Sequence, residues 1–426
     1  MKYLGLKAGK GLPGRIGRTG MILWVWVVVL ALGGSTVLSK DITPENTLPK
    51  SLSRVLSSGD SLLVEDSRGN IVYAYNKDAY RTPASTFKVF TSLLALEKLK
   101  PDFRFTAGIY TDSENNLKIK GFGDPLLISE VLGPLAKEIA SRMPSCKQIV
   151  LDSSFFESPL EIPGTGSTAN PYDAPVGALC ANFNTVFFDW GPGRKPVSAE
   201  PQTPMIPFAQ KIIIDKKYPK GRVLLTQEEE HTTLYAGHLL RHFLVQDGMV
   251  CRDVVLGKVE PGDTLLFTHE SPYTLSEVVK KALEYSNNFI VNQVFLTVGA
   301  REEGAPATLD KAVKTARAFA SEELGIKDLQ IAEGSGLSRD NRIAAIQMMK
   351  VLKKFQPYHT LMHQEEGIWY KTGTLTGVST LVGYFQVGEG QDLGRFVIFV
   401  NTPGGSARRV LDKVLESQQA RTLLKK

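Results

Sequence analysis

The stretch of residues 83–90 constrains the fold of this chain more than any other part of its sequence. A proline opens it, and apolar residues at helical spacing continue through Leu93, so a helix that buries one face is predicted. Ser85 and Lys88 share a face of that helix because they are one turn apart. A serine hydroxyl beside a lysine amine can act as a nucleophile with its base if burial or a second cation keeps the amine neutral. The alternative is a solvated helix start without a chemical role.

The overall composition is that of a globular protein. The chain has 426 residues, of which 42% are hydrophobic and 22% are charged, and its net charge is +6. This length predicts about two or three domains. No basic run dominates, which argues against a nucleic-acid partner, and a mild positive charge suits anionic surfaces only weakly. The cysteines Cys146, Cys180 and Cys251 lack metal-ligand spacing and allow at most one disulfide, whose pair the sequence leaves open.

Residues 1–39 have the order of a secretory signal. Basic residues precede an apolar run at 21–32, and small residues follow it. Because a membrane span needs about 20 residues, cleavage near Ser39 is favoured, and an uncleaved anchor that continues to Leu38 is the alternative. In either case we expect the rest of the protein in the periplasm or cell envelope, with membrane association only through this segment.

The remaining sequence predicts an α+β fold. Two apolar runs in residues 61–75 flank a turn and predict a β-hairpin ahead of the Ser85 helix, which is expected to end near Leu99. Near the C-terminus, strands at 369–375, 378–386 and 396–401 predict an antiparallel meander, followed by an amphipathic helix at 408–422.

Between these parts, mixed helical and strand patterns predict an inserted domain at residues 103–269. Strands are expected there at 106–110, 117–120 and 148–152, and helices at 129–142 and 233–244. Helical patterns follow the insertion at 274–296, 309–324 and 343–355. The main domain would then be discontinuous and comprise residues 47–102 and 270–426.

Two further motifs place polar residues within apolar patterns. Residues 285–288 (YSNN) interrupt a helical pattern with poor helix formers, which indicates either a functional constraint or a local cap or kink. Residues 371–374 (KTGT) begin the predicted meander, where a strand edge can pair with an extended peptide. Lys371 and Thr372 could then hold a carboxylate, and Gly373 would let the substrate backbone approach closely. The alternative is an ordinary strand with a glycine bulge.

Taken together, the motifs resemble those of a known family. Three of them are similar to the active-site triplet of penicillin-binding proteins and serine β-lactamases; they are Ser85-x-x-Lys88, Ser286-x-Asn288 and Lys371-Thr372-Gly373. Residues 121–127 (GFGDPLL) and 333–341 (EGSGLSRDN) resemble further segments of the D-alanyl-D-alanine carboxypeptidase/endopeptidase family. These are the class C low-molecular-mass penicillin-binding proteins, serine peptidase family 13.

The resemblance implies a penicillin-recognising transpeptidase/β-lactamase-like domain, an antiparallel sheet flanked by helices, with a mixed α/β domain inserted after the Ser85 helix. The implied activity is hydrolysis of D-Ala-D-Ala termini or D-Ala cross-links of peptidoglycan stem peptides through an acyl-enzyme. β-Lactam antibiotics would be further ligands. Carboxypeptidase and endopeptidase preferences are not distinguished, and neither are the diamino acid of the substrate and the oligomeric state.

The resemblance also implies residue roles. Ser85 would be the acylated nucleophile, Lys88 its base, and Ser286 the group that passes the proton to the leaving amine. The other positions would bind substrate. Asn288 would hold the substrate amide, Lys371 and Thr372 would engage the terminal carboxylate, and Gly373 would let the substrate backbone approach. The backbone N–H groups of Ser85 and Thr374 would bind the oxyanion, and Asp124 would bind the diamino-acid side chain. For Asp124 the alternative is a simple Asp-Pro turn.

No metal or organic cofactor is implied. The pairs His238/His242 and His359/His363 have a helical spacing that can hold zinc, but no third ligand is evident, so ordinary surface or core positions are favoured.

Two other functions are compatible with the same motifs. A serine β-lactamase would share the acylation chemistry but would need fast deacylation by a positioned water, and a cell-wall-binding scaffold with a decayed cleft would need neither. The sequence departs from the family pattern at Glu333, where the family has aspartate, and in a short stretch between Asn341 and Lys371. The short stretch leaves substrate preference open.

Overall fold

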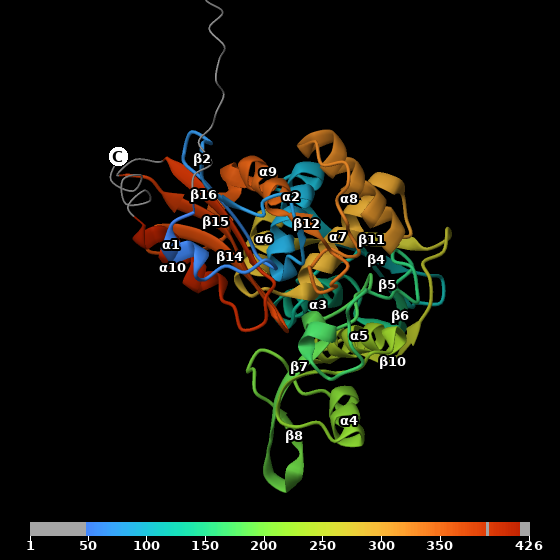
Figure 1. The fold of residues 1–426 in the computed structure, drawn as a ribbon. Helices are drawn as coiled ribbons and strands as arrows, with labels where there is room; N and C mark the ends of the chain where they lie inside the picture. Colours follow the sequence, from blue (N-terminus) through green and yellow to red (C-terminus); the bar gives the residue numbers. More distant parts are fainter. Residues whose placement is uncertain (1–47, 389–391, 418–426) are drawn as a thin grey trace, which may run out of the picture. The chain divides into compact units, whose positions relative to one another are not determined.

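The computed structural model describes residues 48–388 and 392–417, and a six-stranded sheet is built from the two ends of this range (Figure 1). The strand order is β13-β14-β15-β16-β1-β2, and every neighbouring pair is antiparallel. The strands are β1 (Ser61–Glu65), β2 (Ile71–Tyr75), β13 (His363–Glu365), β14 (Ile368–Leu375), β15 (Val378–Gln386) and β16 (Leu393–Val400). The predicted hairpin and the predicted meander are both confirmed.

Both faces of this sheet are covered, because alternate residues of a strand point to opposite sides. In β16, Val397 and Phe399 pack in one apolar cluster, whereas Phe396 and Ile398 pack in another. Helices of the first cluster are α2 (Lys88–Leu99), α6 (Leu275–Glu284), α7 (Asn288–Glu303), α8 (Leu309–Leu324) and α9 (Ala345–Phe355). Those of the second are α1 (Lys50–Ser53) and α10 (Ala407–Glu416). The expected continuation of α10 to residue 422 extends outside the described residues.

The helices agree closely with the predicted periodicity, except that one predicted helix is divided into two. Helix α8 has the predicted bounds, and α9 begins just after the two-residue strand β12 (Ile343–Ala344), which pairs with β3 (Tyr80–Arg81). The helical pattern predicted for 274–296 is instead two helices, because α6 ends at Glu284 and α7 begins at Asn288.

A second sheet lies within residues 104–274 and has the order β10-β6-β5-β4-β11. Its strands are β4 (Arg104–Thr111), β5 (Leu117–Gly121), β6 (Ser145–Asp152), β10 (Val250–Leu256) and β11 (Thr264–Thr274). Strand β6 is parallel to β5 and β10, while β4 is antiparallel to β5 and β11. Helices α3 (Ser129–Arg142), at its predicted bounds, and α5 (Glu229–Gln246) share a separate apolar cluster with the sheet.

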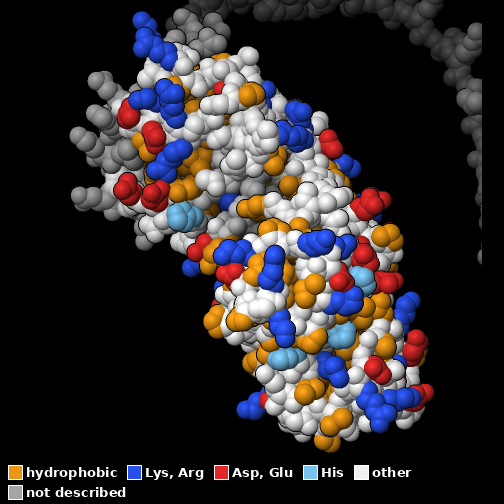
Figure 2. All heavy atoms as spheres, turned by 90° about the horizontal axis from the view of Figure 1, so that it is seen from below, with side chains coloured by type: hydrophobic (Ala, Val, Ile, Leu, Met, Phe, Trp, Pro, Cys, Tyr) orange, Lys and Arg blue, Asp and Glu red, His pale blue; other side chains and the backbone are white. Residues whose placement is uncertain are grey.

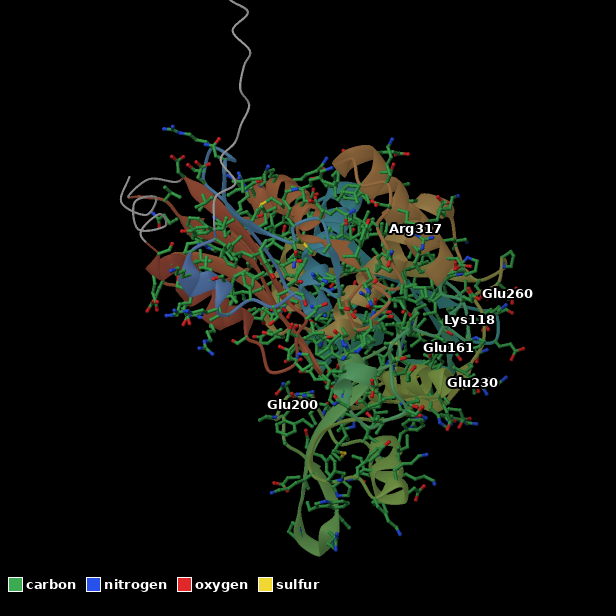
Figure 3. The ribbon with its side chains drawn as sticks, viewed as in Figure 1. Lys118, Glu161, Glu200, Glu230, Glu260 and Arg317 are labelled. Carbon is green, nitrogen blue, oxygen red and sulfur yellow. A yellow bond between two sulfur atoms is a disulfide. The ribbon has the colours of Figure 1, made fainter. Side chains whose placement is uncertain are left out.

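A disulfide between Cys146 and Cys251 joins β6 to β10 and answers the pairing that the sequence left open. Cys180 is buried and has a free thiol. On the same sheet, Lys118 of β5 forms ion pairs with Asp263 at 2.8 Å and with Asp112 at 3.5 Å (Figure 3).

The remaining elements are short. A three-stranded sheet of order β8-β7-β9 comprises β7 (Thr185–Trp190), β8 (Pro196–Ser198) and β9 (Gly221–Leu224), next to helix α4 (Pro207–Lys216). Turns of 3₁₀ helix are η2 (Pro171–Asp173), η3 (Asn182–Asn184), η4 (Pro192–Arg194) and η5 (Gln356–Leu361). The short stretch before Lys371 therefore holds β12, α9, η5 and β13.

The predicted insertion is closely packed with the rest of the chain. Its residues Phe105, Phe156 and Ile162 belong to the same apolar cluster as α2 and α7. The described residues 48–388 and 392–417 fall in one compact unit, so the division into a domain of residues 103–269 and a discontinuous domain stays a prediction.

The charge distribution on the surface and the character of the helices concern two predictions, binding to anionic surfaces and association with a membrane. Lysine and arginine are interspersed with aspartate and glutamate on the face shown in Figure 2, so the positive net charge does not gather there into one continuous surface. In the described part of the chain, no helix combines the length and the apolar character that a membrane crossing requires. The predicted signal segment, residues 1–39, lies outside the described residues.

Candidate active site

Ser85 lies in a tight turn at the start of α2. The 3₁₀ turn η1 (Ala84–Phe87) leads directly into the α-helix at Lys88, so the predicted helix start is a 3₁₀ turn rather than α-helix. Ala84 has a φ of 48°, a conformation that costs energy for a residue with a side chain and is common at functional sites. The Thr86 hydroxyl donates to Pro83 O at 2.6 Å and holds the turn closed.

The Lys88 amine is fully buried and faces three acceptors. It lies 3.1 Å from Ser85 Oγ, 2.6 Å from Asn288 Oδ1 and 2.7 Å from the Ser335 carbonyl. This burial excludes the solvated helix start. A neutral amine can donate to Asn288 and Ser335 and keep its lone pair for the Ser85 hydroxyl proton.

Burial also allows the Lys88 amine to be neutral in a substantial fraction of molecules near neutral pH. Desolvation and the positive charge of Lys371 lower the pKa of Lys88 from 10.5 to about 7, against the opposing effect of the Glu333 carboxylate. A base with a pKa near the working pH has the proton affinity that general-base catalysis requires.

Ser286 lies at the break between α6 and α7. Its φ of 53° is left-handed, and the next residue, Asn287, caps α7 by accepting a hydrogen bond from the Ile290 N–H at 3.0 Å. The polar interruption predicted at 285–288 therefore contains a cap, and it also presents Ser286 and Asn288 to the two lysines. Asn288 is the first residue of α7 and accepts from Lys88.

Lys371 on β14 forms the second serine–lysine contact. Its amine donates to Ser286 Oγ at 3.0 Å and to the Thr372 carbonyl at 3.0 Å, and it is only 4% exposed. Burial lowers the pKa of Lys371 to about 8. Thr372 and Thr374, by contrast, are exposed on the same strand.

Gly373 is required by a close approach within the chain itself, and its contact with a substrate backbone stays a prediction. A Cβ at this position would lie 2.8 Å from the Ser85 backbone N and 2.9 Å from Pro83 O. The missing side chain therefore makes room for the nucleophile turn itself, and the hydroxyl of Thr380 on β15 donates to the same Pro83 carbonyl at 2.6 Å. Strand β13 pairs only with residues 368–370 of β14, so along 371–375 no described strand covers that edge.

Among the described residues, no hydrogen bond or ion pair joins Asp124 to this cluster. Its side chain is 7% exposed, and Oδ1 accepts from the Leu126 N–H at 2.8 Å, which is the predicted turn. The Ser271 hydroxyl lies beside this carboxyl and opposes the effect of burial on its pKa. Burial raises the pKa of Asp124 to about 6.

The loop of residues 333–341, for which no role was predicted, contacts the Ser85–Lys88 pair. Its Ser335 carbonyl accepts from Lys88, and Gly336, with a φ of 80°, packs against the Ala84 carbonyl. The glycines of the EGSGLS segment were the available signal, because close backbone approach is a common reason for glycine.

Two further observations concern a cavity away from the motif residues and the predicted histidine pairs. A cavity of about 980 Å³ lies within the predicted insertion, with Glu161 and Glu230 among its lining residues, but no motif residue lines it (Figure 3). The described residues contain no group of three side chains suited to a metal, and His238 is stacked on Phe208 at 4.8 Å.

Comparison with known proteins identifies relatives over most of the chain. A model of the D-Ala-D-Ala carboxypeptidase 3 (S13) family matches residues 58–224 and 214–366, together more than half of the sequence. The match ends before β14, so the assignment of the Lys371 strand depends on its geometry.

Curated relatives give the same picture. D-alanyl-D-alanine carboxypeptidase DacB of Haemophilus influenzae is 24% identical over 405 residues, which cover 79% of this chain and 83% of that protein. A D-alanyl-D-alanine carboxypeptidase of an Actinomadura species is 24% identical over 410 residues, which cover 78% of this chain and 75% of that protein.

Solved structures share the fold. Penicillin binding protein 4 (dacB) of Haemophilus influenzae superposes with a TM-score of 0.70 at 21% identity, covering 88% of this chain and 99% of that chain. The same relative has been solved in complex with a β-lactam, with a TM-score of 0.66, 20% identity and the same coverage. These likenesses confirm the α+β, penicillin-binding-protein-like fold predicted from the sequence.

Proposed function

The chain belongs to the D-Ala-D-Ala carboxypeptidase 3 (S13) family, and on that premise we propose that it is a serine DD-peptidase of peptidoglycan stem peptides that forms an acyl-enzyme on Ser85. One observation carries the proposal. The Lys88 amine is fully buried and lies 3.1 Å from Ser85 Oγ, which is the arrangement of a nucleophile with its base.

In the proposed acylation, Ser85 Oγ attacks the carbonyl carbon of the penultimate D-Ala while its proton passes to the Lys88 amine. The oxyanion accepts hydrogen bonds from the backbone N–H groups of Ser85 and Thr374, which stabilise the charge that develops in the tetrahedral intermediate. The C–N bond then breaks, and the terminal D-Ala or the cross-linked amine leaves with the Ser286 hydroxyl proton. The proton that Lys88 took from Ser85 replaces it, so that Lys88 is neutral again for deacylation.

Proton supply to the leaving group follows from the second serine–lysine contact. Lys371 donates to Ser286 Oγ at 3.0 Å, and the Ser286 hydroxyl hydrogen is therefore free to point toward the leaving amine. The charge of Lys371 also favours a terminal carboxylate nearby, which Thr372 on the exposed side of β14 would help to bind.

Substrate binding would use the free edge of β14. Because no described strand pairs with residues 371–375 on that side, an extended stem peptide can add there as a further strand. Asn288 would hold the substrate amide, and hydrolysis of the acyl-enzyme by water would regenerate Ser85. We further propose that Asp124 contacts the diamino-acid side chain after a local opening, since its carboxylate is buried here.

Other parts of the proposal concern partners and location. β-Lactams are proposed to acylate Ser85, since a relative with this fold is known in complex with one. We propose a cell-envelope location, and the roles of residues 1–39 in export or membrane association stay predictions. The β-lactamase and scaffold alternatives lose their support, because the family match points to a carboxypeptidase and the Ser85–Lys88 pair is assembled.

The test is the intact mass of the purified protein after brief incubation with benzylpenicillin, followed by peptide mapping. We expect one stable adduct on the peptide that contains Ser85 and none in Ser85→Ala, with unchanged circular dichroism. Labelling that persists in Ser85→Ala would refute the nucleophile, and rapid release of the adduct would favour a β-lactamase.

A further inference from the structure

A second buried charge lies behind the Lys88 amine. The side chain of Glu333 is fully buried, and within the described residues its carboxylate accepts five hydrogen bonds. Oε2 accepts from the Ser335 backbone N at 2.7 Å, Ser335 Oγ at 2.6 Å and Asn292 Nδ2 at 3.1 Å. Oε1 accepts from Asn341 Nδ2 at 2.6 Å and the Ser338 N–H at 3.2 Å. One carboxylate therefore ties together both ends of the loop.

Ser335 connects this carboxylate to Lys88. Its N–H and hydroxyl both donate to Glu333, while its carbonyl accepts from the Lys88 amine at 2.7 Å. The preceding residue, Gly334, is fixed from two sides, by Asn292 Oδ1 at its N–H and by the Thr91 hydroxyl at its carbonyl. Because the loop cannot rotate without breaking several of these bonds, the Ser335 carbonyl keeps its direction toward Lys88.

Two charges act on Lys88, and one further cation binds the backbone two residues before Glu333. Lys371 faces it from β14 and disfavours a second positive charge, whereas Glu333 faces it from the loop and favours one. Arg317 of α8 donates to the Ile331 carbonyl at 3.4 Å, close to Glu333 in sequence (Figure 3). Without Glu333, burial and Lys371 would act on Lys88 unopposed, and its pKa would lie below about 7.

We propose that Glu333 is a positioning residue for acylation, whose carboxylate aims the Ser335 carbonyl at the Lys88 amine and supplies the fixed negative charge that keeps this amine a strong enough base. The inference rests on the function proposed above for Ser85 and Lys88. This role accounts for a buried carboxylate that forms no direct ion pair with Lys88. Ser335 lies between the two groups, because its carbonyl accepts from Lys88 while its N–H donates to Glu333.

The test compares Glu333→Gln, which removes the charge and keeps the size, with Glu333→Asp, which keeps the charge. The second-order rate constant for acylation by benzylpenicillin is measured from about pH 5 to about pH 9. In Glu333→Gln, the acidic limb of the profile should move about one pH unit lower, and the plateau should fall about tenfold. In Glu333→Asp the limb should stay in place. A limb that does not move in Glu333→Gln, or moves equally in both variants, would overturn the proposal.

A third variant covers the case in which Glu333→Gln fails to fold, as judged by its thermal transition. Asn341→Ala keeps the carboxylate but removes its 2.6 Å donor, so acylation should slow about fivefold without a shift of the limb. Acylation at the wild-type rate would contradict the positioning role. If wild-type protein forms no adduct at Ser85, the proposed function itself fails; if it does and the variants behave alike, only the role of Glu333 is lost.

Discussion

Replacing Gly373 with alanine is expected to slow acylation of Ser85 far more than it disturbs the fold. Gly373 lies in the middle of β14 and has no positive φ, so its backbone accepts alanine without strain. The obstacle is space. The new Cβ would lie 2.8 Å from the Ser85 backbone N and 2.9 Å from Pro83 O, and Cβ contacts below 3.0 Å are essentially not observed. The turn that carries the nucleophile must therefore move away from β14.

The structure sets the size of the effect. Two of the three crowded neighbours are backbone atoms, and the third, Thr380 Oγ1, can rotate only by losing its 2.6 Å hydrogen bond to Pro83 O, worth about 1 kcal/mol. Overpacking of this kind costs about 1–3 kcal/mol, which a domain with a stability of about 5–15 kcal/mol survives. A shift of the reacting atoms by about 1 Å, however, can lower the rate about 100-fold.

The assay is the rate of labelling by a fluorescent penicillin, with urea denaturation of the same preparations. Gly262→Ala is the matched control, because a Cβ at Gly262 would meet nothing within 4 Å. We expect a folded Gly373→Ala protein that labels about 10 to 100 times more slowly than both wild type and the control. Labelling at the wild-type rate would show that the turn accommodates the methyl group, and the steric argument would be wrong.

Three further perturbations test other parts of the structure. The rate of acylation should rise as Lys88 loses its proton near pH 7 and fall as Lys371 loses its proton near pH 8, so a flat rate profile would contradict both roles. Removing the Cys146–Cys251 disulfide, which closes a 105-residue separation, should lower the free energy of unfolding in urea by up to about 4–5 kcal/mol and leave acylation unchanged; an unaltered midpoint would refute this. Burial raises the pKa of Asp124 from 3.8 to about 6, so the folded state loses stability as pH rises through that window. Asp124→Asn should therefore melt higher than wild type at pH 7.5, with the gap closing toward about pH 4, and a gap independent of pH would count against a buried carboxylate.

Much of the fold follows from local periodicity. Helices α3 and α8 have the predicted bounds because their apolar residues recur at helical spacing, and α8 is also capped by Thr308 and Gly325. The meander follows from alternating strands joined by short turns. Local patterns also pointed to the motif residues Ser85, Lys88 and Ser286, whose catalytic roles stay predictions.

The rest depends on distant contacts that no local pattern encodes. The close approach of Gly373 to the Ser85 backbone was not predicted, because the two residues are far apart in the sequence. The sequence showed Glu333 only as a departure from the family pattern, because its hydrogen bonds to Asn292 and Asn341, which fix the loop behind Lys88, depend on the fold. The break at Ser286 was indicated by its polar residues, but the left-handed φ that divides α6 from α7 was not.

Catalytic competence in this protein carries a cost in stability that can be measured. The Lys88 amine has a pKa of about 7 when folded, against 10.5 for an exposed lysine, so between these values the unfolded chain binds the proton more tightly. The stability of wild type must therefore rise with pH across that window. Lys88→Met has no such group, and it also leaves Asn288 Oδ1 and the Ser335 carbonyl without their donor, which costs about 1–3 kcal/mol each at any pH.

The difference between wild type and Lys88→Met separates these two effects. The lost hydrogen bonds lower the free energy of unfolding of the variant by the same amount at every pH. The buried amine, by contrast, makes the free energy of unfolding of wild type rise by about 2–3 kcal/mol relative to the variant between about pH 7 and about pH 9. Urea denaturation at the two pH values measures this gain, and penicillin labelling of the folded variant should be absent. A stability difference that stays constant with pH would mean that Lys88 keeps an ordinary pKa in the folded state. Lys88 would then be protonated at neutral pH, and it could not serve as the base for Ser85.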